Sequence, residues 1–306
     1  MAIDRKLVSI EPKSFPDYEL AVVAAGAQLS PINSEVGALI WTDYAKPQAL
    51  LDLLDANPQI EWVQLPFAGV DAFAEVLKRE VIFTSAKGSY RQPVAEHALA
   101  LCLALARKIP ERVVAKTWGK KFAVSLYDSH IVIVGGGGIA EELVSLLRPF
   151  NTRVTVVRKH PEKIEGTTET VAFDRLDEFI AIADFVVLAA ALTEETLYLF
   201  DLRRFELMKP TAYLINIARG KMIDSDALKT ALESGIIAGA AVDVTDPEPL
   251  PDGHALWSAP NLLITPHTAD TNAQVIRLFS MRIDENVKAW LGDGEWVGRV
   301  DQKLGY

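Results

Sequence analysis

Short β-branched runs alternate with segments of helical periodicity along most of the chain, and this alternation constrains the fold more than any other feature. In the N-terminal part the predicted strands are Leu7–Ile10, Ala38–Trp41, Glu61–Leu65 and Val81–Thr84. Helical patterns lie between them, for example at Gln48–Leu54 and Val70–Lys78. Strands that alternate with helices pair in parallel through helical crossovers, so the pattern predicts an α/β fold.

The alternation stops once and then restarts, which indicates two sheets. One long helical stretch, Val94–Lys116, separates the first series from a second that begins at Ile131. The later strands of the second series are predicted at Val154–Val157, Phe185–Ala189, Ala212–Asn216, Ala238–Val244 and Leu262–Thr265. A last helical pattern covers Asn272–Leu291. A chain of 306 residues is long enough for two domains with separate cores.

Charge and composition exclude several classes of partner. The formal net charge of -10 repels nucleic-acid phosphates and anionic lipid, so we expect neither as a partner. The single cysteine, Cys102, excludes an internal disulfide, and the N-terminus has no signal-peptide pattern, so we expect a cytoplasmic location. The longest apolar run, Ala98–Ala106, is too short for the ~18 residues of a membrane span.

A run of four glycines follows the predicted strand at Ile131 and precedes a helical pattern. A dinucleotide fold needs one glycine for the turn, a second for close approach of the pyrophosphate, and a third small residue for helix packing. Gly135, Gly137 and Ala140 have this spacing. The amides of Gly138 and Ile139 would then face phosphate oxygens. A glycine run alone is as consistent with a simple tight turn, and the strand and helix on either side favour the dinucleotide.

The residue that ends the next strand distinguishes the two nicotinamide cofactors. A carboxylate there binds the ribose 2′-hydroxyl and repels a 2′-phosphate, whereas a guanidinium binds that phosphate. This chain has Arg158, followed by Lys159 and His160. The sequence therefore favours NADP(H), with NAD(H) as the alternative. The competing interpretation is a solvated basic turn that leads into Pro161.

Three loops that follow later strands carry an arginine, a glutamate and a histidine. Arg219, Glu248 and His267 lie just beyond the predicted strands of the second sheet. Loops at the carboxyl ends of parallel strands converge on one crevice. Carbonyl reduction needs a proton donor, a cationic substrate anchor and a group that keeps the donor protonated, and these side chains supply those roles. Taken singly, each is more often an ordinary loop or surface residue. We interpret His97 as a capping or core residue and expect no metal site.

The chain resembles the D-isomer-specific 2-hydroxyacid dehydrogenase family over essentially its whole length. The stretches that carry the resemblance are Phe67–Asp71, Val94–His97, Gly135–Ala140, Leu192–Thr196, Asn216–Gly220, Asp243–Pro251 and Pro266–His267. The alanines Ala189 and Ala191 depart from the polar and proline residues common in the family at that point.

The resemblance implies specific roles for residues of this chain. Arg219 would hold the substrate carboxylate and carbonyl, Glu248 would pair with the imidazole, and His267 would be the acid/base. The loop of Phe67, Ala68 and Gly69 would offer backbone amides to the substrate carboxylate. Further cofactor contacts would come from Thr196, Ala218 and Asp243, with Asp243 facing the nicotinamide amide. The structural alternatives for Thr196 and Asp243 are a turn residue and a strand-end cap.

Within the family, the Asp243–Pro251 stretch together with Arg158 is similar to glyoxylate/hydroxypyruvate reductases that prefer NADPH. We therefore predict two doubly wound α/β domains with parallel sheets. A Rossmann cofactor domain at 93–271 is expected to be inserted into a flavodoxin-like substrate domain at 1–92 and 272–306, with hinges near Pro93 and Thr271. The expected activity is NADP(H)-dependent conversion of a short 2-oxo acid to a D-2-hydroxy acid.

Two alternatives of function stay open at this point. One is a D-3-phosphoglycerate-type dehydrogenase, for which Lys87 and Arg91 are the candidate phosphate ligands, although we expect no regulatory domain after residue 306. The other is a non-catalytic dinucleotide-sensing protein on the same fold. A homodimer is expected by resemblance. The apolar helix from Val94 and the following Trp118 fit a subunit contact or core packing within one chain equally well.

Overall fold

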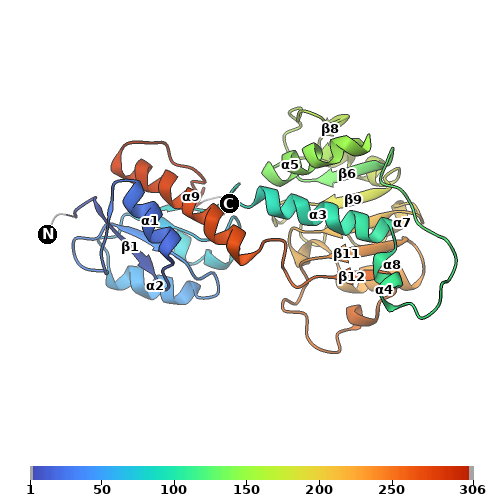
Figure 1. Ribbon diagram of the computed structural model, residues 1–306, viewed down its shortest axis with the longest axis horizontal. Coiled ribbons are helices and arrows are strands. Elements are labelled where there is room, and N and C mark those ends of the chain that lie inside the picture. The colour runs from blue at the N-terminus through green and yellow to red at the C-terminus, as the bar shows by residue number, and fades with distance from the viewer. Residues whose placement is uncertain (1–2, 303–306) are drawn as a thin grey trace. The chain divides into compact units, whose positions relative to one another are not determined.

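The computed structural model describes residues 3–302 and forms two compact units (Figure 1). The terminal unit consists of Met1–Tyr90 and Thr271–Tyr306, and the central unit consists of Arg91–Asp270. Among the described residues, none of the helices has the length and hydropathy needed to cross a bilayer. Each unit is built on its own parallel sheet, so the predicted fold class is confirmed.

The terminal unit contains a five-stranded sheet in the order β2-β1-β3-β4-β5, with every pair of neighbours parallel. Its strands are β1 (Leu7–Glu11), β2 (Gln28–Leu29), β3 (Ala38–Trp41), β4 (Trp62–Gln64) and β5 (Ile82–Thr84). Its helices are α1 (Pro16–Ala24), α2 (Pro47–Ala56) and α9 (Asn272–Leu291), with short 3₁₀ turns η1 (Asp71–Phe73) and η2 (Val76–Lys78). This strand order is the flavodoxin-like one. Helices α1 and α9 pack on each other through Tyr18 and Phe279, whose rings are 5.3 Å apart.

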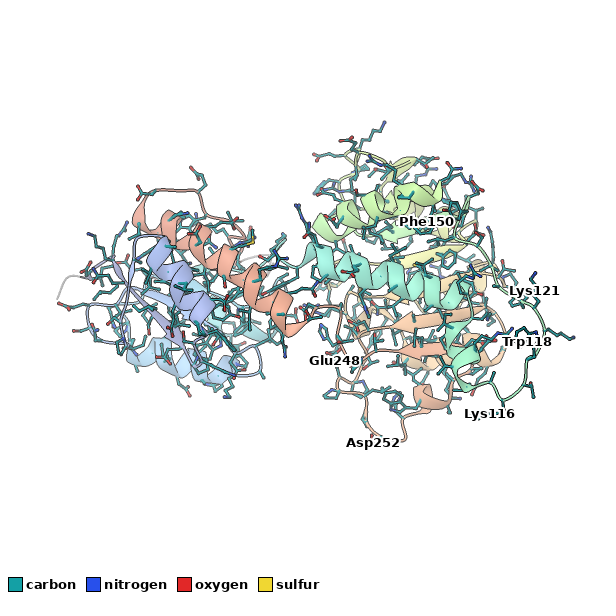
Figure 2. The ribbon with its side chains drawn as sticks, in the orientation of Figure 1. Lys116, Trp118, Lys121, Phe150, Glu248 and Asp252 are labelled. Atoms are coloured by element: carbon teal, nitrogen blue, oxygen red, sulfur yellow. The ribbon has the colours of Figure 1, made fainter. Side chains whose placement is uncertain are left out.

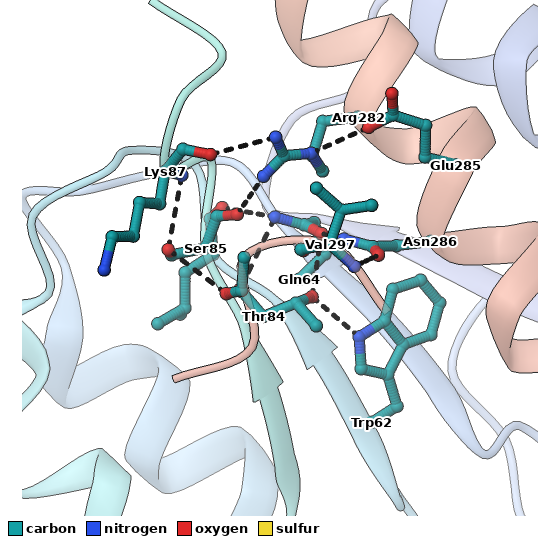
Figure 3. Close-up of polar contacts among 11 residues, drawn as sticks. Trp62, Gln64, Thr84, Ser85, Lys87, Arg282, Glu285, Asn286 and Val297 are labelled. Atoms are coloured by element: carbon teal, nitrogen blue, oxygen red, sulfur yellow. Dashed lines mark hydrogen bonds and ion pairs between the residues drawn. The ribbon is translucent and has the colours of Figure 1, made fainter. Parts of the chain in front are cut away.

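A buried polar network ties helix α9 to the sheet of the terminal unit (Figure 3). Gln64 Oε1 accepts hydrogen bonds from Thr84 Oγ1 at 2.8 Å and from Asn286 Nδ2 at 2.6 Å. Trp62 Nε1 donates to Thr84 Oγ1 at 2.9 Å, and Arg282 Nη1 donates to the carbonyl of Ser85 at 2.7 Å. A buried polar group is stabilising only when it is hydrogen-bonded, so this network fixes the position of α9.

The central unit contains a seven-stranded parallel sheet in the order β12-β11-β10-β9-β6-β7-β8. Its strands are β6 (His130–Val134), β7 (Arg153–Val157), β8 (Glu169–Val171), β9 (Phe185–Leu188), β10 (Tyr213–Asn216), β11 (Gly239–Val242) and β12 (Leu262–Ile264). The chain leaves β6 in one direction toward β8 and then crosses back to β9. This reversal is the topological switch of the dinucleotide-binding fold, where ligands bind at the carboxyl ends of the strands.

Helices cover both faces of the central sheet, and the strand residues alternate between two cores. The helices are α3 (Arg91–Ala106), α4 (Ile109–Val114), α5 (Gly138–Leu147), α6 (Leu176–Ile180), α7 (Leu202–Leu207) and α8 (Ser225–Glu233). The 3₁₀ turns are η3 (Arg148–Phe150), η4 (Phe173–Arg175), η5 (Gly220–Met222) and η6 (Ala255–Ser258). Residues Ile131 and Ile133 face α3 and α5, which lie side by side in Figure 1, whereas Val132 and Val134 join the core with α6–α8.

Two predicted helical segments differ from the structure. The Val94–Lys116 stretch is two helices, α3 and α4, because Lys108 adopts a left-handed backbone with φ 56° that ends the helical path. The Val70–Lys78 segment forms only the turns η1 and η2. Its apolar side chains, such as Phe73 and Val76, are buried at helical spacing, so the periodicity reflected burial and not continuous α-helical hydrogen bonding.

Candidate active site

The loops after β10, β11 and β12 meet at one edge of the central sheet because these strands are adjacent and parallel. The loop after β10 carries Arg219, the loop after β11 carries Asp243 and Glu248, and the loop after β12 carries His267. The structure therefore brings the arginine, the glutamate and the histidine into the same part of the central unit.

The turn that carries Arg219 is fixed by its own backbone and by the neighbouring loop. Asn216 Oδ1 accepts from the amide of Ala218 at 3.0 Å, and Asn216 Nδ2 donates to the carbonyl of Arg219 at 2.9 Å. A β-carbon on Gly220 would collide with the carbonyl group of Thr245. Only glycine permits this approach, so the Arg219 turn lies directly against the loop that leads to Glu248.

Glu248 and His267 form a charged pair. The distance between His267 Nδ1 and Glu248 Oε1 is 2.6 Å, and Glu248 Oε2 accepts from the amide of Thr245 at 3.3 Å. The hydrogen bond to Glu248 raises the pKa of His267 above its ordinary value, although burial and the charge of Arg219 oppose the shift. The same hydrogen bond lowers the pKa of Glu248, and Arg219 lowers it further.

The pair is accessible to a ligand, and its open nitrogen suits proton donation. The side chains of His267 and Glu248 are 54% and 40% exposed, and Figure 2 shows the position of Glu248 on its loop. Because Nδ1 is held by the carboxylate, Nε2 is the nitrogen left to exchange a proton with a substrate. A raised pKa favours the protonated imidazole, which is the form that a general acid requires.

Asp243 is buried at the end of β11 and organises the histidine loop. Its side chain is 1% exposed, and Oδ1 accepts from Thr265 Oγ1 at 2.6 Å and from the amide of Thr268 at 2.9 Å. Oδ2 accepts from the amide of Ala269 at 3.2 Å. Burial raises the pKa of Asp243, but hydrogen bonds from His97, Thr265 and Thr268 outweigh it, so the net pKa is lowered. The carboxylate therefore stays ionised and acts as a strand-end cap.

The glycine run forms an open cradle at the start of α5. Gly135 has φ +113°, and a β-carbon there would come within 2.6 Å of the Ala189 carbonyl group. Gly137 has open space in the direction of a β-carbon, and as the N-cap of α5 it leaves the first amides without a side-chain partner. The amides of Gly138 and Ile139 are thus available to phosphate oxygens, and the cradle fits a dinucleotide.

Arg158 lies over the cradle, next to a second basic residue. A β-carbon on Gly136 would come within 2.6 Å of Arg158 Cδ, so the arginine stem passes across the glycine loop. Lys159 Nζ lies 3.7 Å from a carboxylate oxygen of Glu195 in an exposed ion pair. Arg158 therefore lies against the glycine loop, and Lys159 follows it in the chain.

The remaining predicted residues occupy two different settings. Thr196 is buried, and its hydroxyl donates to the carbonyl of Ala191 at 2.8 Å, so it shapes the turn after β9. Ala218 is buried beside Arg219. Phe67, Ala68 and Gly69 belong to the terminal unit, where they follow β4 and the carbonyl of Phe67 accepts from the amide of Ala86.

Sequence reasoning missed the part that His97 and Thr265 take in this site. His97 Nε2 lies 3.3 Å from Asp243 Oδ1 and 3.1 Å from Thr265 Oγ1. A polar residue on the buried face of an otherwise apolar helix was the available signal. Within residues 3–302, no cluster of histidine, cysteine or acidic side chains has the arrangement of a metal site.

The fold, the glycine cradle and the Glu248–His267 pair are those expected of a dinucleotide-dependent oxidoreductase. Residues 99–269 match the family "D-isomer specific 2-hydroxyacid dehydrogenase, NAD binding domain". The chain belongs to the D-isomer specific 2-hydroxyacid dehydrogenase family. It is thus an NAD(P)-dependent oxidoreductase of 2-hydroxy acids, and its cofactor is a nicotinamide dinucleotide.

Individual relatives extend over most of the chain. A mouse glyoxylate reductase/hydroxypyruvate reductase is 30% identical over 92% of this chain and 86% of its own length. A glyoxylate reductase of Pyrococcus furiosus is 34% identical over 71% of this chain and 68% of its own. A D-isomer specific 2-hydroxyacid dehydrogenase of Xanthobacter autotrophicus, solved with NADPH and MES, aligns with a TM-score of 0.83 and 27% identity over 98% and 99% of the two chains.

The Glu248–His267 pair predicts a defined pH dependence. The Glu248→Gln substitution removes the main cause of the raised pKa, so the pKa of His267 should fall toward 6.5. A histidine whose pKa is raised by folding stabilises the folded state fully at pH values below 6.5. This stabilisation is lost as the pH rises through the pKa of the folded state. A glutamate whose pKa is lowered by folding stabilises the folded state fully at pH values above 4.5, and this stabilisation is lost as the pH falls through the pKa of the folded state. Glu248→Gln should therefore cost most stability between pH 4.5 and pH 6.5.

NMR titration of the imidazole and urea unfolding at several pH values measure both effects. The matched control is Glu178→Gln, which breaks an exposed glutamate–arginine pair in the same unit. An unchanged pKa of His267 in Glu248→Gln would show that the carboxylate does not hold the imidazole protonated.

Proposed function

We propose that this protein reduces a short 2-oxo acid, such as glyoxylate or hydroxypyruvate, to the D-2-hydroxy acid with NADPH. The observation that carries the proposal is the 2.6 Å contact between His267 and Glu248, with Arg219 close enough to lower the pKa of both. Relatives named for glyoxylate and hydroxypyruvate reduction, similar over most of the chain, support the choice of substrate.

The side chains divide the chemistry in the following way. Protonated His267 donates its Nε2 proton to the carbonyl oxygen as negative charge develops there. Glu248 stabilises the imidazolium before the transfer and holds the ring in one orientation. Arg219 binds the substrate carboxylate, for which a planar guanidinium is well suited. A bound reduced nicotinamide supplies the hydride. We assign cofactor binding to the central unit. The backbone amides of Phe67–Gly69, in the terminal unit, are assigned to the substrate carboxylate.

Arg158 and Lys159 are the basis for the NADPH preference. The chain carries a formal net charge of -10, so the cation of Arg158 beside the glycine cradle, followed in the chain by Lys159, would give a local site for a phosphate. Arg158 passes across Gly136. The residue that follows β7 is Arg158 and not a carboxylate, and the guanidinium of this partly buried residue would form bidentate contacts with a 2′-phosphate.

Replacing His267 tests the catalytic role. His267→Gln should lower kcat for glyoxylate or hydroxypyruvate by about 10²- to 10⁴-fold, because a positioned general acid contributes that much. NADPH oxidation followed at about 340 nm measures it, over a panel of 2-oxo acids that includes 3-phosphohydroxypyruvate. His254→Gln, which changes the histidine that caps η6, is the control and should retain activity. Normal turnover by His267→Gln would refute the role.

The same panel separates the phosphoglycerate-type alternative. Lys87 and Arg91 were its candidate phosphate ligands, and Arg91 Nε lies 3.9 Å from Glu142 Oε2, which partly neutralises it. We therefore expect the unphosphorylated acids to have the higher kcat/KM. A clear preference for 3-phosphohydroxypyruvate would reverse this assignment.

Arg158 should set the cofactor preference. Arg158→Gln should raise the Kd for NADPH by about ten- to a hundredfold, the value of a lost charge-assisted contact of about 1.5–3 kcal/mol, and should leave NADH binding nearly unchanged. Nicotinamide fluorescence titration measures both constants. Lys163→Gln removes an exposed cation further along the same loop and serves as the control. Equal weakening of both cofactors would contradict a role for Arg158 in phosphate recognition.

An exposed apolar surface on the central unit supports a homodimer. Helix α3 packs into the core of the central unit. Trp118, in contrast, is 98% exposed, so packing in the core does not explain this tryptophan. Figure 2 shows Trp118 on the segment that follows α4. Val113 and Val114 are 77% and 70% exposed on α4. Exposed apolar side chains of this size are often buried in protein contacts, and two-fold dimers of identical chains are the commonest assembly.

Charge on this surface should separate the subunits. Val113→Glu with Val114→Glu should shift the mass measured by light scattering from twice 33.6 kDa to 33.6 kDa, because each carboxylate would be desolvated at the contact. Ile182→Glu, at a side chain that is 47% exposed elsewhere in the central unit, is the control and should stay dimeric. A monomeric wild-type protein would exclude the dimer.

A further inference from the structure

His97 is a nearly buried histidine on α3 for which the proposed reaction gives no role. Its side chain is 19% exposed, and its neighbours Ala95 and Ala98 are fully buried in the core under the sheet. Nε2 of His97 lies within hydrogen-bonding distance of Thr265 Oγ1, at 3.1 Å, on the loop that carries His267. This contact between α3 and the loop that carries His267 joins two side chains.

The direction of each hydrogen bond in this cluster follows from the acceptors. Asp243 is ionised, so its carboxylate only accepts, and it receives the single hydroxyl proton of Thr265 over 2.6 Å. The Thr265 oxygen can then only accept from His97. His97 must therefore carry its proton on Nε2, and this N–H faces both Thr265 Oγ1 and, at 3.3 Å, Asp243 Oδ1.

The cluster holds the backbone of the histidine loop. The amides of Thr268 and Ala269 donate to the Asp243 carboxylate, and the amide of His267 donates to the Asp243 carbonyl at 2.7 Å. His267 itself has φ 49°, a left-handed conformation that costs a non-glycine residue energy and persists only where surrounding contacts hold it. A loop held in this way depends on the orientation of the Asp243 carboxylate.

We propose that His97 is a positioning residue for His267, acting through Thr265 and Asp243. Its N–H fixes the hydroxyl and the carboxylate in the arrangement that accepts the loop amides, and this keeps the His267 ring against Glu248. The inference rests on the proposed function only for its effect on turnover. A histidine that merely fills a place in the core would change stability and leave the properties of His267 in the folded protein unchanged.

Two substitutions at one position separate positioning from packing. His97→Phe keeps a planar ring and removes the N–H, whereas His97→Gln places an amide N–H where Nε2 was. In the ligand-free protein, the pKa of His267 measured by NMR should move toward 6.5 in His97→Phe, because its contact with Glu248 is populated less. It should stay raised in His97→Gln. His254→Phe, which loses a ring-nitrogen hydrogen bond elsewhere in the unit, should also leave it raised.

Turnover gives the second measurement. His97→Phe should lower kcat by about ten- to a hundredfold, the effect of a misplaced catalytic group, and His97→Gln should restore most of it. Thr265→Val breaks the same chain of contacts, so the double variant His97→Phe/Thr265→Val should be no slower than the slower single variant.

The outcomes that overturn the inference are distinct from failure of the proposed function. An unchanged His267 pKa in His97→Phe, equal losses in His97→Phe and His97→Gln, or additive losses in the double variant each refute it. A wild-type protein that reduces none of the 2-oxo acids refutes the proposed function, and the titration of His267 in the ligand-free variants still decides the role of His97.

Discussion

The site depends on the hydrogen bonds that the buried carboxylate of Asp243 accepts. This carboxylate ends a central strand, is almost completely shielded from water, and stays charged only because hydroxyl and amide donors converge on it. A buried ion without such partners would cost several kcal/mol, so the loop after β12 is forced to supply them. That requirement places Thr268 and Ala269 over the strand end and leaves His267 in its left-handed conformation.

The second constraint is the packing of neighbouring loops at the carboxyl edge of a parallel sheet. Glycine at position 220 lets the Arg219 turn approach the backbone of Thr245, and glycine at position 135 lets the cradle approach Ala189. A side chain at either position would separate loops that must lie close together. The cradle and the charged pair therefore sit on a frame whose spacing is set by backbone contact, and loop side chains add the chemistry.

Local charge in the central unit opposes the charge of the whole protein. The chain is acidic overall, yet Arg158 lies beside the glycine cradle and Arg219 lies near Glu248 and His267. Such grouping concentrates positive potential where anionic groups of a dinucleotide and a 2-oxo acid would bind. The acidity of the rest of the chain need not weaken these positions, because screening in water limits the range of exposed charges to about 10 Å.

The fold class, the glycine cradle and the three residues at the strand ends could all be predicted from the amino-acid sequence. These depend on local periodicity and on a topological rule for parallel sheets, and both are written in short stretches such as Ile131–Val134 and Gly135–Gly138. Periodicity failed at 70–78 and near Lys108, where burial and one left-handed residue decided the backbone.

The contacts that support the site depend on how whole elements pack in the folded chain. His97 and Thr265 are 168 positions apart, and no local pattern relates them, but α3 packs under the sheet whose edge carries Thr265. The same holds for Trp118, whose exposure depends on where the segment after α4 lies. A hydrogen bond between distant residues forms only when the packing of whole elements brings donor and acceptor within about 3 Å, and sequence spacing carries no record of that distance.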